Sequence, residues 1–146
     1  MTSGVDKLYC RLLNSPDFVE CDAAVALNAL NEGTQSLTAY AMDRAGNLSP
    51  PAEYSWIVDL TPPTTRIIDP IPPTLSISNM EMIHFEGDDS TGSGVDHFKC
   101  YLNDTLLADC ASPAQLQNLA DGNYSFLVQS VDKVGWESLP AQLTSW

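Results

Sequence analysis

Apolar and polar residues alternate with a period of two over several stretches of this chain. The alternation is clearest over residues 82–86 and 124–131, and residues 35–42 repeat the second of these patterns earlier in the chain. Strict alternation sends successive side chains to opposite faces of an extended backbone. These stretches are therefore predicted to be strands of antiparallel sheets with one buried and one wetter face.

Two further segments carry a weaker signal. Residues 22–30 are rich in alanine and have the best helical periodicity in the chain, but the matching residues 111–119 contain Pro113. Proline disrupts a helix interior, so both segments are predicted to be extended or turn-like. Prolines are dense from 62 to 73, which predicts a stiff connector with an edge strand over 65–68.

The chain repeats itself at a spacing of about 90 residues. Ser-Gly-Val-Asp occurs at 3–6 and again at 93–96, and Asp43-Arg-Ala-Gly is answered by Asp132-Lys-Val-Gly. A period of this size is a whole domain, well above the roughly 20–50 residues of a solenoid repeat. We predict two domains, 1–60 and 61–146. The first has no counterpart for the roughly 25 residues that precede Ser93, so it is expected to lack its opening strands.

Cysteines occur as one pair in each repeat, Cys10 with Cys21 and Cys100 with Cys110. The residues between the members of each pair are turn-forming, so folding back about the turn places the two sulfurs opposite one another on neighbouring strands. We predict one disulfide in each repeat and therefore export to an oxidising compartment. Two alternatives stay open: a site of four thiolates around a metal, although Cys-x-x-Cys spacing is absent, and free buried thiols.

The negative charge of the chain disfavours binding to negatively charged molecules. The 146 residues include 19 Asp and Glu but only six Lys and Arg, for a formal net charge of −13. Such a surface repels phosphate backbones and anionic membranes, which argues against nucleic-acid binding. No stretch approaches the roughly 20 apolar residues of a membrane span, and no signal peptide precedes the predicted disulfides. The chain is expected to be a piece of a longer exported protein.

Several spaced motifs, each with a full or partial counterpart in the other copy, together resemble one family. They are the Ser-Gly-Val-Asp segment, the two cysteines, Leu-Ala-Asp-Gly-Asn-Tyr, Val-Asp-Lys-Val-Gly, and a Pro-Ala segment that ends in Trp56 or Trp146. This pattern resembles the bacterial immunoglobulin-like repeats of surface and secreted proteins. The resemblance implies tandem antiparallel β-sandwiches of the immunoglobulin or fibronectin type III kind. The second copy departs from it at Trp136, where the first copy has Asn47.

Acidic residues are the obvious candidates for a metal site, since calcium prefers carboxylate and carbonyl oxygens. Seven aspartates are candidates for such a site: Asp6, Asp43, Asp59, Asp88, Asp89, Asp96 and Asp132. An Asp that caps a turn before Gly46 or Gly135 explains two of them without a metal, and no Asp-x-Asp-x-Asp-Gly loop is present. We assign no metal site and no cofactor at this stage. No nucleophile with an oriented base can be assembled either, so the chain is predicted not to be an enzyme.

Trp136 stands in a predicted loop and has no counterpart in the first repeat. With Tyr101 and Asp104 it forms the candidate ligand-binding set, because an aromatic side chain in a loop can stack on a sugar or anchor a protein contact. The hypotheses are an adhesion module of a bacterial surface or fibre protein that binds a glycan or protein, a passive spacer, and an accessory domain of a secreted hydrolase. Bare sheet edges in the first domain predict a homo-oligomer, for which a trimer is one possibility.

Overall fold

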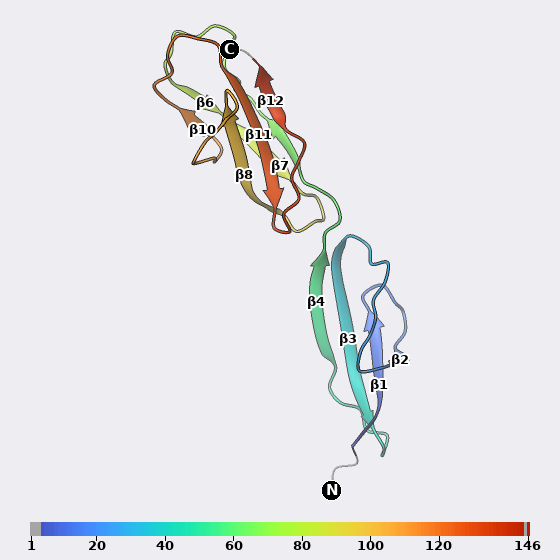
Figure 1. The fold of residues 1–146 in the computed structure, drawn as a ribbon. Coiled ribbons are helices and arrows are strands. Elements are labelled where there is room, and N and C mark those ends of the chain that lie inside the picture. The colour runs from blue at the N-terminus through green and yellow to red at the C-terminus, as the bar shows by residue number, and fades with distance from the viewer. Residues whose placement is uncertain (1–3, 145) are drawn as a thin grey trace. The chain divides into compact units, whose positions relative to one another are not determined.

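The computed structural model describes residues 4–144 and 146 and consists of strands, turns and loops. All of its strand pairs are antiparallel, which confirms the all-β prediction. The chain divides into two compact units, Met1–Val58 (unit 1) and Asp59–Trp146 (unit 2) (Figure 1). The described residues include no helix that is long and apolar enough to cross a membrane.

Unit 1 is a single four-stranded sheet in the order β2-β1-β3-β4. Its strands are β1 (Val5–Leu12), β2 (Val19–Cys21), β3 (Gly33–Asp43) and β4 (Ala52–Val58). No second sheet covers it within residues 4–58. Cys10 is the one apolar side chain that this part of the described chain buries fully. Unit 1 is therefore half of a sandwich.

Unit 2 is a two-layer sandwich. One layer is a sheet in the order β12-β11-β8-β9, and the other consists of the pairs β5-β7 and β10-β6. The strands are β5 (Thr64–Ile67), β6 (Glu81–Ile83), β7 (Phe85–Asp88), β8 (Val95–Leu102), β9 (Thr105–Leu106), β10 (Ala114–Leu116), β11 (Ser125–Asp132) and β12 (Ala141–Thr144).

The core of unit 2 lies between these layers and follows from the alternation in the sequence. Phe126, Val128 and Ser130 are fully buried on one face of β11, while Leu127 and Gln129 alternate with them and are only half-buried. Ile83 and Phe85 meet this face from the opposite layer. Full burial of a large apolar side chain contributes about 1.5–3 kcal/mol, so this cluster supplies much of the stability of unit 2.

A buried hydroxyl cluster ties the two layers together. Thr65 Oγ1 lies 2.6 Å from Ser130 Oγ and 2.7 Å from Ser138 Oγ. The Ser130 N–H donates to Thr65 Oγ1 at 2.8 Å, and the Ser138 N–H donates to the Ser130 carbonyl at 2.9 Å. A buried polar group destabilises the fold unless it is hydrogen-bonded, and all three hydroxyls in this cluster are hydrogen-bonded. The cluster fixes β5, and hence the chain just before it, against β11.

The two copies of the repeat differ outside their shared strands. Strands β1, β3 and β4 of unit 1 pair in the same order as β8, β11 and β12 of unit 2. The first extended segment, 22–30, contains no strand, whereas its counterpart forms β10. The proline-free copy is thus the irregular one. In unit 2 this segment pairs with β6, and unit 1 has no such strand among its described residues.

Both predicted disulfides are present, Cys10–Cys21 and Cys100–Cys110, with Cα separations of 5.8 and 5.4 Å. Their placement differs from the prediction that the two cysteines lie directly opposite. Cys21 pairs with Leu8 in the register, so its bridge to Cys10 is diagonal, and Cys110 lies in the loop beyond β9. The bridges indicate an oxidising, extracellular compartment.

Candidate functional site

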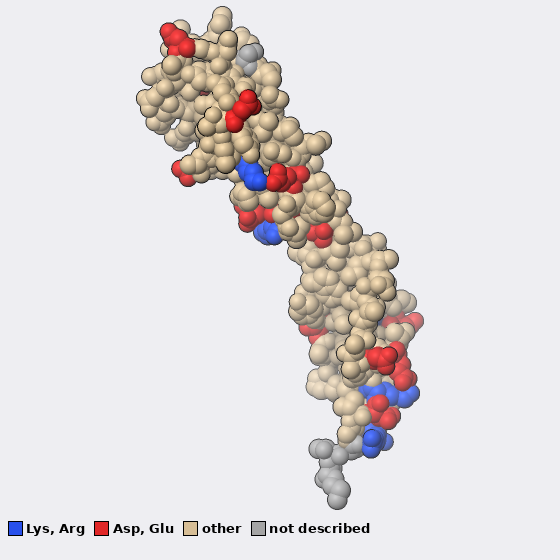
Figure 2. Space-filling model, viewed as in Figure 1, with Lys and Arg blue, Asp and Glu red and all other residues tan. Residues whose placement is uncertain are grey.

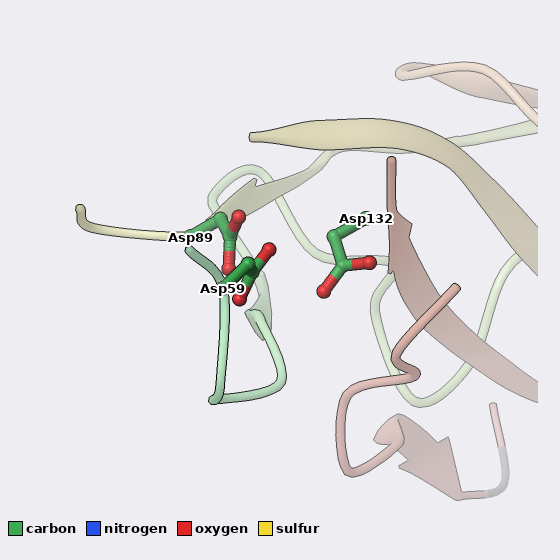
Figure 3. Close-up of side chains that lie close together, drawn as sticks. All are labelled: Asp59, Asp89 and Asp132. Atoms are coloured by element: carbon green, nitrogen blue, oxygen red, sulfur yellow. The ribbon is translucent and has the colours of Figure 1, made fainter. Parts of the chain in front are cut away.

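Three aspartates from separate segments of unit 2 meet at one end of the sandwich. Asp59 precedes β5, Asp89 follows β7 directly, and Asp132 is the last residue of β11. One carboxylate oxygen of each lies within 4.8 Å of those of the other two. Figure 3 shows the Asp59 and Asp89 carboxylates side by side, with Asp132 facing them. We call these residues the acidic triad.

Asp132 is held rigidly and is almost inaccessible, with 2% of its surface exposed. Its Oδ1 accepts the backbone N–H groups of Val134, Gly135 and Trp136 at 2.9, 2.7 and 2.9 Å. Its Oδ2 is buried and accepts no hydrogen bond from any described residue. Burying a carboxylate oxygen without a hydrogen-bond donor costs free energy of folding, which a bound ligand at this atom would recover.

The equivalent turn in the first repeat contains a side-chain donor that the second repeat lacks. Asp43 caps the equivalent turn, where its Oδ1 accepts the N–H groups of Ala45 and Asn47 at 2.8 and 2.9 Å. Its Oδ2 accepts the Asn47 side-chain amide at 3.0 Å. Trp136 replaces that asparagine in unit 2 and offers no amide. The same turn therefore satisfies both carboxylate oxygens in unit 1 and only one of them in unit 2.

The loop after β7 shapes the rest of the site. Asp89 Oδ2 accepts the Gly94 N–H at 2.6 Å. A Cβ placed on Gly92 would lie 2.6 Å from Asp89 Oδ2 and 2.9 Å from its Cγ, so only glycine leaves room for this carboxylate. The glycine-rich loop therefore closes tightly around the Asp89 carboxylate.

Asp59 is half-buried, and its Oδ2 accepts the Ser93 N–H at 2.8 Å. The nearby Ser93 hydroxyl, followed by the Ser93 N–H, lowers the pKa of the Asp59 carboxyl. The hydroxyl is close to the carboxylate but does not form a well-aligned hydrogen bond with it. Asp59 Oδ1 is buried and has no hydrogen-bond partner. The lowered pKa keeps Asp59 charged, and one of its carboxylate oxygens has no hydrogen-bond donor.

No described Lys or Arg forms an ion pair with Asp59 or Asp132. The few Lys and Arg side chains in Figure 2 lie among scattered acidic groups, in keeping with the net charge of −13. Backbone N–H groups donate to all three carboxylates, and Lys133 Nζ is nearby, 3.3 Å from where a Cβ on Gly94 would lie. Such a site can hold a cation.

The turn-capping interpretation of Asp43 and Asp132 is correct as far as it went. What sequence reasoning missed is that the Asp132 carboxylate lies close to those of Asp59 and Asp89, which are distant along the chain. The other candidates lie elsewhere: Asp88 and Asp96 bond a neighbouring backbone N–H and His97, and Asp6 and Asp43 belong to unit 1.

The structure does not bring the candidate ligand-binding residues together. Trp136 lies in the loop after β11, beside the acidic triad, and half of its surface is exposed (50%). Tyr101 and Asp104 lie at the end of β8 and in the turn that follows it, where Leu102 pairs with Phe126 near the start of β11. Since β8 and β11 run antiparallel over this length, the two groups occupy opposite ends of unit 2. They cannot contact one small ligand.

Comparison with known proteins finds a distant structural likeness. No family model and no curated protein matches the chain. Among solved structures, it is similar to fibronectin(III)-like modules of Clostridium thermocellum CbhA, at 17% identity over 97% of this chain and 78% of that one, with a TM-score of 0.45. The strand pairing and two-layer core of unit 2 establish the antiparallel sandwich independently of this likeness.

Proposed function

We propose that the chain is a non-enzymatic recognition module of an exported bacterial surface or fibre protein, and that Trp136 anchors a glycan or protein ligand. The observation that carries the proposal is that this large aromatic side chain is half exposed while its backbone is fixed. Its N–H donates to the buried Asp132 carboxylate at 2.9 Å. An exposed indole on a fixed backbone is a common anchor of binding surfaces, because it supplies a large contact area with few rotatable bonds.

The rest of unit 2 supports recognition over chemistry. Sandwiches of this kind are typically non-catalytic modules, and fold alone does not select their ligand. The charge of −13 disfavours nucleic acid and anionic membranes as partners. Tyr101 and Asp104 form a separate surface at the other end of unit 2 and are proposed as a secondary contact.

Screening the whole chain on glycan and protein arrays tests this function. We expect a ligand whose affinity falls about 30-fold in Trp136→Ala, the loss typical of a hot-spot residue. Leu139→Ala, which truncates an exposed apolar residue near Trp136 in the sequence, is the control and should bind normally. Absence of any ligand, or full binding by Trp136→Ala, would contradict the proposal.

Two other functions use the same fold. A passive spacer would have inert surfaces, and an accessory domain of a secreted hydrolase would serve a catalytic domain elsewhere in the parent protein. The full-length parent sequence separates them, because a spacer lies within a longer run of similar repeats. The exposed and rigidly held Trp136 favours recognition over both.

We further propose that the chain self-associates through unit 1, with a trimer as one possible state. Its edge strand β4 carries Tyr54, which is 70% exposed, and the sheet has no second layer among the described residues. Bare edges and open apolar faces recruit partners. Size exclusion with light scattering should give a mass above 15.8 kDa. Tyr54→Lys should reduce it, and a monomer at all concentrations would contradict the idea.

A further inference from the structure

We propose that the acidic triad, Asp59, Asp89 and Asp132, binds a calcium ion. The inference goes beyond the recognition function and does not depend on it. It concerns a site inside unit 2, assembled from the segment before β5, the loop after β7 and the turn after β11.

The buried Oδ2 of Asp132 carries the proposal. Within the described chain this atom has no donor, while three N–H groups hold Oδ1 and so fix the direction of Oδ2. In Figure 3 the carboxylate faces Asp59 and Asp89. A second buried oxygen, Asp59 Oδ1, also lacks a hydrogen bond. Two buried carboxylate oxygens without donors, within one cluster of three carboxylates, are accounted for by a cation that binds the cluster.

The substitution between the repeats points the same way. In unit 1 the equivalent second oxygen accepts the amide of Asn47 at 3.0 Å, so that turn needs no ion. In unit 2 that side-chain amide is absent, and an oxygen of the Asp132 carboxylate instead lies within 4.8 Å of oxygens of Asp59 and Asp89. Loss of a donor together with a gain of negative charge is what conversion of a turn cap into a cation site requires.

The spacing and the fixed carboxylates suit calcium. The three oxygens lie within 4.8 Å of one another, close enough for one ion to contact all three. Calcium binds oxygens at about 2.3–2.6 Å in flexible geometry, whereas magnesium demands a near-ideal octahedron at about 2.0–2.1 Å. Asp59 and Asp89 are each tied by a backbone N–H, which favours the ion with the less strict geometry. Water fills the remaining positions of the larger ion.

Calcium binding would reinforce contacts among three segments that β5–β7 and β8–β11 pairing already bring together. The ion would fix the chain entering β5, the 89–94 loop and the turn that carries Trp136. The backbone N–H groups of Ser93, Gly94 and Trp136 all donate to triad carboxylates, so their exchange with solvent reports on the site.

The test uses the whole chain, freed of metal with a chelator and titrated with calcium chloride by calorimetry. We expect one site with a Kd of about 10⁻⁴ M, as in extracellular calcium modules, and magnesium weaker by at least about tenfold. At 10 mM calcium the Tm of unit 2 should rise by about 10 °C. Hydrogen exchange at Ser93, Gly94 and Trp136 should slow, with unit 1 unaffected. No binding up to 10 mM, or equal binding of magnesium, would overturn the proposal.

Variants assign the site. Asp132→Asn keeps an acceptor for the turn and replaces the second oxygen with an uncharged donor, so it should fold and lose at least about tenfold in calcium affinity. Asp59→Asn, at a less buried position, should do the same. Asp43→Asn is the matched control in unit 1 and should bind calcium normally. Unchanged affinity in both triad variants, with circular dichroism showing a folded chain, would place any bound calcium elsewhere and overturn the assignment.

Two further measurements distinguish a bound calcium ion from a proton shared among the three carboxylates. Trp136→Asn restores the amide of unit 1 and should weaken calcium binding while raising the Tm of the metal-free chain. If a proton shared among the carboxylates satisfied the site instead, calcium would leave the Tm of the unaltered chain unchanged. That result would overturn the proposal.

Discussion

Phe126→Ala is expected to cost unit 2 about 3–5 kcal/mol, the range for removing a fully buried aromatic side chain from a core. Phe126 is 0% exposed and packs between the layers, with its ring 6.1 Å from that of Phe85. Domains are stable by about 5–15 kcal/mol in total, so the substitution brings unit 2 close to unfolding. The exchange rates of β11 amides in increasing urea measure the loss.

Leu37→Ala is the matched control, because Leu37 occupies the equivalent place in unit 1. Leu37 pairs with Leu12 and Tyr54 across its sheet, as Phe126 pairs with Leu102 and Leu143. It is only half-buried, and no second sheet packs on it among residues 4–58. Its truncation should cost below about 1.5 kcal/mol, since little area leaves water there. Comparable losses at the two positions would show that the unit 1 face is covered as tightly as the unit 2 core.

Strand positions were largely predictable because burial on one face imposes a period of two. The alternation over 124–131 corresponds to β11 (Ser125–Asp132), and that over 82–86 corresponds to β6 and β7, which are interrupted at His84. The pairing of cysteines followed from the repeat, since each pair spans one turn. These are local signals, and local chemistry fixes them.

Long-range placement was not predictable in the same way. Residues 22–30 and 111–119 match in the repeat, yet only the second segment forms a strand, because β10 needs β6 as its partner. Trp136, Tyr101 and Asp104 looked alike as exposed loop residues, and the antiparallel run of β8 against β11 sends them to opposite ends. Both outcomes depend on which strands pair, and the sequence of one segment does not reveal its partner strand.

The acidic triad illustrates the limit most clearly. The change from Asn47 to Trp136 was visible in the sequence, but its consequence depends on where Asp59 and Asp89 lie. Gly92 carried a further signal, since a glycine beside Asp89 leaves room for that carboxylate. A repeat thus shows which turn has changed, while the fold shows what now faces it.

Removing the Cys100–Cys110 bridge is the second substitution expected to have a large effect. The bridge closes a sequence separation of ten residues, for which the entropy of the unfolded chain predicts about 2–3 kcal/mol. Cys100 is also 0% exposed within the core, so Cys100→Ala with Cys110→Ala loses packing in addition to the link. Given urea m-values of about 1–3 kcal/mol/M, the midpoint of unit 2 should fall by at least about 1 M.

The Cys10–Cys21 bridge provides the control. Its sequence separation of 11 gives nearly the same chain-entropy effect, but it lies in a unit without a second layer, so the alanine pair there should lose mainly the link. Reducing the unaltered chain isolates the link in each unit, because both sulfurs stay in place. A midpoint for unit 2 that neither reduction nor the alanine pair moves would mean that the core holds without the bridge. Export to an oxidising compartment would then not be a condition for folding, and the inference from cysteines to location would lose its physical basis.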